Sequence, residues 1–193
     1  AAACGIPTQN IVVADATGAI GWTLAGPLPH RPASPAGSAP SAPRALPDFP
    51  MHANVYRGWD GYVDPHDYPR HLDPPDARLW TANSRQLSGA AQSTIGDGGS
   101  DVGARATQIR DALFARAHFA ERDLLALQID DRALWIERWR RIALETLDAD
   151  ALAGHPQRAE YRRLLEQWNG RADAEAVGYT LLRALYAAMY DAW

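Results

Sequence analysis

The sequence has little of what several classes of protein need. It contains a single cysteine, so no disulfide can form within the chain and the redox compartment cannot be inferred. Lysine is absent, and the 19 basic residues, all arginine, are outnumbered by 23 acidic residues, which gives a net charge of −4. Because phosphate binding needs a surplus of basic groups, nucleic acid is not an expected partner. No apolar run of about eighteen residues occurs, and no charged segment precedes an apolar one at the beginning, so we expect neither a membrane span nor a signal peptide.

A β-hairpin is predicted near the beginning of the chain. Residues 10–14 and 19–24 are short runs rich in β-branched and other apolar side chains, a composition typical of strands. They flank Asp-Ala-Thr-Gly at 15–18. In such a turn the Asp side chain accepts hydrogen bonds from nearby backbone N–H groups and Gly adopts a positive φ. We therefore expect two antiparallel strands joined by a tight turn.

A long loop is predicted from residue 27 to residue 78. The segment is crowded with Pro, Gly, Ser and Asp, and proline disfavours helices and central strands because it lacks the backbone N–H and fixes φ. Residues 31–44 are so rich in Ala, Pro and Ser that we expect disorder there. The part that follows carries enough aromatic and apolar surface to fix it against the protein. These side chains are Phe49, Met51, Tyr56, Trp59, Tyr62 and Tyr68.

After residue 101 the hydrophobic pattern becomes helical. We expect a helix capped by Ser100 or Asp101, a short helix from about residue 121, and three longer helices after it. The second of these three is expected to end at Gly170, because glycine favours the positive φ that follows many helices. The apolar stripes that predict the four longer helices are Val102, Ala106, Ile109 and Leu113; Leu134, Trp135, Trp139, Ile142 and Leu147; Tyr161, Leu164, Leu165 and Trp168; and Val177, Leu181, Leu182, Leu185, Met189 and Trp193.

Three segments resemble, in the same order, segments of one enzyme family. They are QNIVVADATGAIGW at residues 9–22, LWTANSR at residues 79–85 and GARATQI at residues 103–109. All three are similar to segments of the penicillin acylases, in which Thr-Ala-Asn carries the asparagine that stabilises the oxyanion. Shorter similarities occur at WDGYV, DPPD and WNG. Because several ordered matches rarely arise by chance, the chain resembles this family over essentially its whole length.

The resemblance implies the fold and chemistry of an N-terminal nucleophile hydrolase. These enzymes have an αββα core, and their precursor cleaves itself to expose an N-terminal Ser that attacks an amide carbonyl, with its own α-amino group as base. The chain begins with Ala1, so we interpret it as an interior piece of the catalytic subunit and expect it to be inactive alone. The hairpin would belong to one sheet of that core, and it would expose strand edges and apolar faces in the isolated chain.

The resemblance also indicates the candidate site residues. Asn83 corresponds to the oxyanion asparagine, a donor that lowers the barrier by about 3 kcal/mol in such sites; without the other matches it would be interpreted as an ordinary turn residue. Arg105 matches a family arginine near the active site, whose donors can hold the asparagine carbonyl or orient a polar substrate group. The alternative for Arg105 is a solvated arginine at a helix end. Gln9 matches a position that lines the acyl pocket, and Ser84 stands where many relatives have a second Asn.

Other chemical patterns are weaker. Cys4 is a conceivable nucleophile, but an unpaired Cys is more often a small buried apolar residue. GDGGS at 96–100 lacks the Lys-Ser/Thr of a phosphate-binding loop. Asp130 is interpreted as a helix cap or the buried partner of an arginine. Six histidines and aspartates of the long loop could be imagined as a metal cluster, but their spacing matches no ligand pattern. They are His52, His66, His71, Asp64, Asp67 and Asp73.

The sequence therefore predicts an α+β fold with a hairpin at 1–26, a Pro/Gly-rich region with the oxyanion-asparagine segment at 27–100, and a mostly helical region at 101–193. By resemblance it is part of a periplasmic or secreted amidohydrolase that acts on linear acyl amides. Its partners would be the small subunit, the rest of the large subunit and a small acyl amide, which could be a β-lactam, an acyl-homoserine lactone or another. We expect no cofactor in this piece; a structural calcium of the full enzyme would take its main ligands from elsewhere. The alternative is a non-catalytic helical interaction module with an aromatic partner-binding loop.

Overall fold

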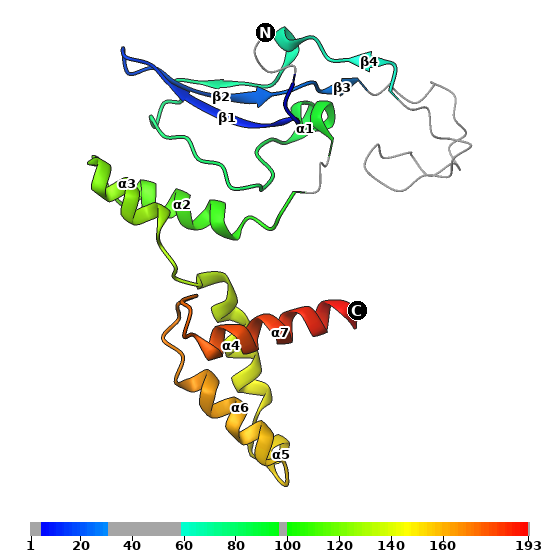
Figure 1. The fold of residues 1–193 in the computed structure, drawn as a ribbon, viewed down its shortest axis with the longest axis vertical. Helices are drawn as coiled ribbons and strands as arrows, with labels where there is room; N and C mark the ends of the chain where they lie inside the picture. The colour runs from blue at the N-terminus through cyan, green and yellow to red at the C-terminus, as the bar shows by residue number, and fades with distance from the viewer. Residues whose placement is uncertain (1–4, 31–58, 97–99, 193) are drawn as a thin grey trace. The chain divides into compact units, whose positions relative to one another are not determined.

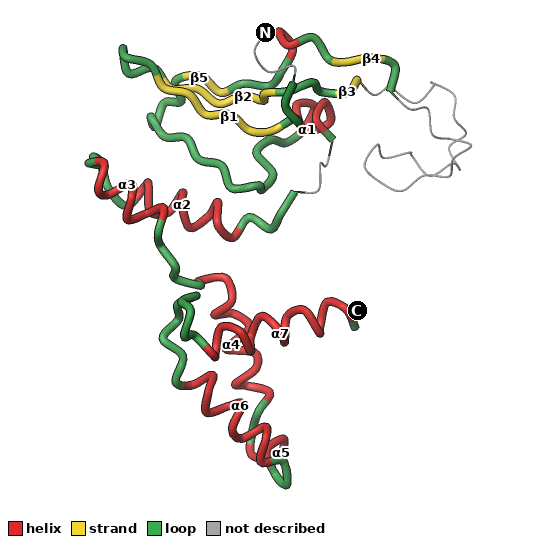
Figure 2. Tube along the Cα trace, in the orientation of Figure 1, coloured by secondary structure: helices red, strands yellow, loops and turns green. Residues whose placement is uncertain are grey.

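The computed structural model describes residues 5–30, 59–96 and 100–192. Cys4, the segment expected to be disordered at 31–44, and Phe49, Met51, His52 and Tyr56 lie outside the described residues. The chain divides into two compact units, residues 1–113 and residues 114–193. The strands belong to the first unit, and the second is helical (Figure 1, Figure 2). The predicted α+β class is confirmed.

The hairpin predicted near the beginning of the chain is confirmed. β1 (Gln9–Ala14) and β2 (Ile20–Ala25) pair antiparallel, and Gly18 in the turn has a φ of 91°. The Asp15 carboxylate accepts hydrogen bonds from the Thr17 hydroxyl at 2.7 Å and from the Thr17 backbone N–H at 2.8 Å. These two bonds, the hydroxyl first, lower the pKa of Asp15 because they favour its charged form.

In its described residues, the segment predicted to be a long loop also contains three short strands. β5 (His71–Leu72) pairs antiparallel with β2, so the first sheet has the order β1-β2-β5. β3 (Pro29–His30) pairs with β4 (Gly61–Tyr62) in a second sheet, and one short 3-10 helix, η1 (Pro65–Asp67), follows β4. Strands of two residues are too short to give an alternating hydrophobic pattern, which is why the sequence did not reveal them.

One aromatic residue fixes this loop region to the hairpin, as expected. Tyr68 is buried, and its hydroxyl donates to the Gly26 carbonyl and accepts from the Leu28 backbone N–H, both at 2.8 Å. Trp59 and Tyr62 differ, since both are exposed. The described aromatic residues of the loop region, Trp59, Tyr62 and Tyr68, therefore do not form one packed cluster.

The two hairpin strands differ strongly in burial. β2 lies in the middle of the three-stranded sheet and carries Trp22, which is 2% exposed. β1 is at the edge, and its residues Ile11, Val12 and Val13 are 38 to 52% exposed. This agrees with the expectation that the hairpin exposes a strand edge and apolar faces in the isolated chain.

Two helices complete the first unit. α1 (Gly89–Ile95) occupies a stretch without an apolar period, so the sequence did not predict it. α2 (Ala104–Phe114) is the helix expected after residue 101, and Ala106 is its buried residue. The expected helix cap is wrong for Asp101, because its carboxylate accepts from the backbone N–H of the adjacent Val102 and not from within α2.

The second unit has a core formed by three helices. Its elements are α3 (Glu121–Gln128), α4 (Leu134–Thr146), α5 (Ala149–Leu152), α6 (Pro156–Glu166) and α7 (Val177–Asp191). Ile136 of α4, Leu165 of α6 and Leu182 of α7 are almost completely buried, and Trp168 packs with them. The prediction from the stripes is confirmed in part. Leu134, Val177 and Met189 are exposed, and the buried Ile136 was not among the predicted residues. The predicted stripe residues that do belong to this core are Trp135, Trp139, Tyr161, Leu165, Trp168, Leu181, Leu182 and Leu185.

The predicted end of α6 is wrong. The helix ends at Glu166, before Gly170. Gly170 has a φ of 80°, and its carbonyl accepts from the Ala133 backbone N–H at 2.9 Å, while Arg132 and Arg171 form an antiparallel bridge. The glycine therefore permits a turn that brings the chain beside the start of α4, a long-range pairing that helix periodicity cannot reveal.

Candidate active site

Asn83 lies in a segment with an uncommon backbone conformation. Its φ is 59°, in the left-handed region that Asn tolerates better than most residues. The Asn83 carbonyl accepts from the Asp101 backbone N–H at 2.8 Å, and Ser84 forms a parallel bridge with Asp101. The backbone that carries Asn83 is thus fixed to the residues that immediately precede α2. Positive φ at a residue other than glycine is a feature that recurs at functional sites.

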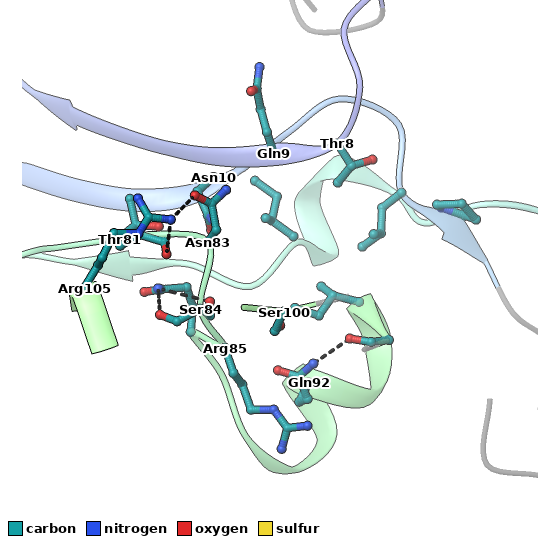
Figure 3. Close-up of a pocket in the computed structure, with 17 residues that line it drawn as sticks. Thr8, Gln9, Asn10, Thr81, Asn83, Ser84, Arg85, Gln92, Ser100 and Arg105 are labelled. Atoms are coloured by element: carbon teal, nitrogen blue, oxygen red, sulfur yellow. Dashed lines mark hydrogen bonds between the residues drawn. The ribbon is translucent and has the colours of Figure 1, made fainter. Parts of the chain in front are cut away.

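Arg105, in the first turn of α2, holds the Asn83 side chain. Its Nη2 donates to Asn83 Oδ1 at 2.9 Å and to the Ala82 carbonyl at 3.3 Å (Figure 3). The Asp101 carboxylate lies 3.7 Å from the same nitrogen. A guanidinium group can only donate, so Oδ1 must face Arg105 and the amide nitrogen Nδ2 must face the other way. Within the described part of the chain this nitrogen has no hydrogen-bond acceptor. Asn83 is therefore an oriented N–H donor.

A cavity of about 630 Å³ lies beside this pair in the first unit. Most of its lining is formed by amide and hydroxyl side chains, with two arginines and a few apolar residues. Among the described lining residues there is no Asp, Glu, His or Cys. The lining consists of Thr8, Gln9, Asn10, Leu24, Leu28, Pro29, Thr81, Ala82, Asn83, Ser84, Arg85, Gln86, Gln92, Ile95, Gly96, Ser100 and Arg105. The cavity therefore offers hydrogen-bond donors and acceptors, and it lacks an ordinary general base.

The three residues predicted from the resemblance, Gln9, Asn83 and Arg105, all line this cavity. Arg105 and Asn83 are in direct contact. Gln9 is different, because its side chain extends away from Asn83 on the other side of β1 (Figure 3). The roles of all three in catalysis or substrate binding stay predictions.

Asn10 is a cavity residue that the sequence analysis did not identify. It follows Gln9 on β1, and neighbouring side chains on a strand point to opposite faces. Its Oδ1 accepts from the Trp22 indole Nε1 at 3.0 Å across the hairpin. The alternation of the strand could have drawn attention to Asn10, since it is the polar residue on the face that carries Trp22.

Two glutamines on the cavity wall each donate an amide N–H group to a backbone carbonyl. Gln92 of α1 donates from Nε2 to the Gly96 carbonyl at 2.5 Å, and its Oε1 is buried without a partner in the described residues (Figure 3). Gln86 donates from Nε2 to the Ser84 carbonyl at 3.3 Å. The Ser84 carbonyl thus holds a neighbouring amide.

The remaining candidates have structural roles. Asp130 is the partner of an arginine, Arg132, at 2.6 Å. In the long loop, Asp64 caps η1, Asp73 accepts from the Ile20 backbone N–H, and His71 packs on Trp22 with 5.5 Å between the ring centroids. No group of three or more His, Cys, Asp or Glu in the described residues has the arrangement of a metal site.

Comparison with known proteins gives the family of this chain. A family model for penicillin amidase matches residues 1–193. The penicillin acylase 2 proenzyme of Pseudomonas sp. (strain SE83) is 28% identical over 185 residues, which cover 96% of this chain and 22% of that relative. The chain thus spans less than a quarter of the relative's length. No helix among the described residues is both long and apolar enough to cross a membrane. The match over the whole sequence establishes that the chain belongs to the penicillin amidase family.

Proposed function

We propose that this chain is part of an amidohydrolase that cleaves a linear acyl amide, and that Asn83 stabilises the negative oxygen of the tetrahedral intermediate. The single observation that carries the proposal is the contact of Arg105 Nη2 with Asn83 Oδ1 at 2.9 Å. This contact turns the Asn83 N–H group away from Arg105, on the wall of a cavity large enough for a small acyl amide. A donor that is oriented before the substrate binds needs no reorganisation when charge develops on the oxygen.

In this proposal Arg105 is a positioning residue. Its guanidinium group holds both Oδ1 of Asn83 and the preceding carbonyl, so the asparagine amide cannot rotate without losing a hydrogen bond to a charged donor. The nearby Asp101 carboxylate reduces the net charge around Arg105. Asn83 itself stays neutral at every working pH, so its donor strength does not titrate.

The nucleophile in this proposal comes from another part of the enzyme. A hydroxyl must be activated by an adjacent base, and the described lining residues include Ser84 and Ser100 without a carboxylate or imidazole among them. An N-terminal Ser with its own α-amino group would supply both functions, as the family resemblance implies. The rest of the same precursor would then be the partner of this chain, and a periplasmic or secreted location belongs to the same proposal. A structural calcium, if the whole enzyme binds one, would likewise take its main ligands outside this chain.

The experiment compares Asn83→Ala and Asn83→Asp in the enzyme that contains this chain. Asp has nearly the same shape and tolerates the left-handed backbone, but it lacks the N–H donor. We expect kcat to fall by about a hundredfold or more in both variants, because the donor acts on charge that develops during the reaction. Asn169→Ala, in the second unit, is the control and should keep the parental kcat. Near-parental kcat in the Asn83 variants would remove this residue from the catalytic site.

A further inference from the structure

The Asn10 side chain is oriented in the same way as that of Asn83. The indole Nε1 of Trp22 can only donate, so the oxygen of the Asn10 amide must face Trp22. Trp22 is 2% exposed and lies on the central strand β2, which makes this partner a rigid one. The amide nitrogen of Asn10 therefore faces away from the Trp22 indole, and within the described ranges no acceptor binds it.

Asn10 and Asn83 line the same cavity, and each has its amide oxygen held by a donor. Asn10 is half-buried on β1, and the segment with Asn83 lies beside this strand (Figure 3). The two residues come from distant parts of the sequence and are held by two different donors, Trp22 and Arg105. Because no carboxylate lines the cavity in its described part, an oxygen of a ligand does not meet like charge there.

We propose that Asn10 is a substrate-binding residue, and that its Nδ2–H donates to a second oxygen of the acyl amide, in the acyl chain close to the carbonyl that Asn83 addresses. The proposal rests on the function proposed above, which names the amide carbonyl as the ligand of Asn83. It assigns a substrate class: acyl amides that carry a carbonyl, hydroxyl or carboxylate oxygen near the scissile bond. A purely apolar acyl chain leaves the Asn10 N–H group without a partner, and such a loss lowers affinity.

The test measures binding of two matched probes to the 193-residue chain. Acetoacetanilide and butyranilide are anilides with four-carbon acyl chains, and they differ only in a carbonyl in place of a methylene at the third carbon. We expect the chain to bind acetoacetanilide about three- to tenfold more tightly, the range that one hydrogen bond contributes. In side-chain NMR spectra, acetoacetanilide should shift the NH₂ resonance of Asn10 more than butyranilide does.

Asn10→Asp isolates the donor. Asp keeps an oxygen for the Trp22 indole but replaces the NH₂ group with a second oxygen, so the preference for acetoacetanilide should disappear. Val12→Asp is the matched charge control, since Val12 lies on the same strand, is 46% exposed and does not line the cavity. This control should keep the preference. Circular dichroism and Trp fluorescence would verify folding of both variants.

Each outcome decides the proposal. Equal affinity of the parental chain for the two probes, or a preference that survives Asn10→Asp, overturns the role of Asn10. If Asn10→Asp keeps the preference while Asn83→Ala lowers kcat about a hundredfold in the enzyme that contains this chain, the Asn10 proposal fails and the function proposed for Asn83 stands. If neither probe binds the parental chain, the Asn10 proposal fails, and the kcat of the Asn83 variants in the whole enzyme decides the function proposed for Asn83. If Asn10→Asp does not fold, the shift of the Asn10 NH₂ resonance in the parental chain decides, and an unperturbed resonance overturns the proposal.

Discussion

At the scale of single residues, the candidate site depends on amide groups whose direction is chemically determined. An amide has a donor end and an acceptor end, and a partner that can only donate or only accept fixes which end faces it. Arg105 fixes Asn83, Trp22 fixes Asn10, and the Gly96 carbonyl fixes Gln92. The cavity therefore has an ordered pattern of donors and acceptors before any ligand binds, and this reduces the reorganisation that binding requires.

Gly178 provides a residue-scale prediction about packing. A Cβ atom at this position would lie 2.5 Å from Cβ of Trp168 and 3.2 Å from the Leu164 carbonyl oxygen, so α7 or the tryptophan must move. We expect Gly178→Ala to lower the free energy of unfolding by about 1–3 kcal/mol, the usual cost of overpacking. This exceeds the gain of up to about 1 kcal/mol that Ala has over Gly in a helix. Urea unfolding of the parental chain and the variant measures the difference.

Gly103→Ala is the control for this prediction. A Cβ atom there would have no neighbour within 4 Å, and the backbone of Gly103 is outside the positive-φ region. We expect unfolding of this variant at the parental urea concentration or slightly above it. A Gly178→Ala variant as stable as Gly103→Ala would show that the contact with Trp168 relaxes without cost.

The resemblance predicted Asn83 and Arg105 but could not predict how they meet. The two residues are 22 positions apart, and their contact requires both the turn at Asn83 and the start of α2. Asn10 was missed because a polar residue at the beginning of a strand is common. It becomes a candidate site residue only through its contact with Trp22 and the cavity that it shares with Asn83. Contacts of this kind follow from tertiary structure, which local patterns do not contain.

At the scale of elements, the turn of the hairpin is stabilised by hydrogen bonds to the Asp15 carboxylate, a group that titrates. The Asp15 carboxylate accepts hydrogen bonds from the Thr17 hydroxyl, from the Thr17 N–H and from the Ala19 N–H, and these bonds lower its pKa. A lowered pKa in the folded chain means that the charged form stabilises the turn. This stabilisation is complete above the ordinary pKa of about 4 and is lost as the pH falls through the lowered value.

We therefore predict that acid loosens the turn of the hairpin. In the parental chain the backbone N–H resonances of Thr17 and Ala19 should change together as the pH falls below about 4. Asp15→Asn keeps one acceptor oxygen without a titrating proton, so the change should be absent in that variant. Thr17→Val removes the largest cause of the shift, and the pKa of Asp15, measured by carboxyl NMR, should rise toward its ordinary value. An unchanged Asp15 pKa in Thr17→Val would contradict the assignment.

Elements with a strong local signal were predictable, and those created by long-range contacts were not. The hairpin has both a strand composition and a turn sequence, and α4, α6 and α7 have clear apolar stripes. β3, β4 and β5 have two residues each, so they exist only because another strand lies beside them. The end of α6 was predicted too late because Gly170 serves a long-range pairing with Ala133.

At the scale of the whole molecule, the two compact units differ in how they bury apolar surface. In the first unit the edge strand β1 leaves several apolar side chains exposed. The second unit has a continuous core of buried residues that includes Ile136, Leu165 and Leu182. Stability should therefore differ between the units, because a unit with its own core can fold as one cooperative structure.

We predict that residues 114–193, expressed alone, fold into a helical structure that unfolds cooperatively. Small domains of this size bury only about 60% of the surface of their unfolded chain, so their stability depends strongly on each core side chain. Leu165→Ala should destabilise the segment by about 2–5 kcal/mol, since Leu165 is fully buried. Leu125→Ala, at a position that is 56% exposed, should change the free energy of unfolding by no more than about 0.5 kcal/mol. Circular dichroism during thermal unfolding measures both effects, and a broad, non-cooperative transition, or equal effects of the two substitutions, would mean that this core does not form without the first unit.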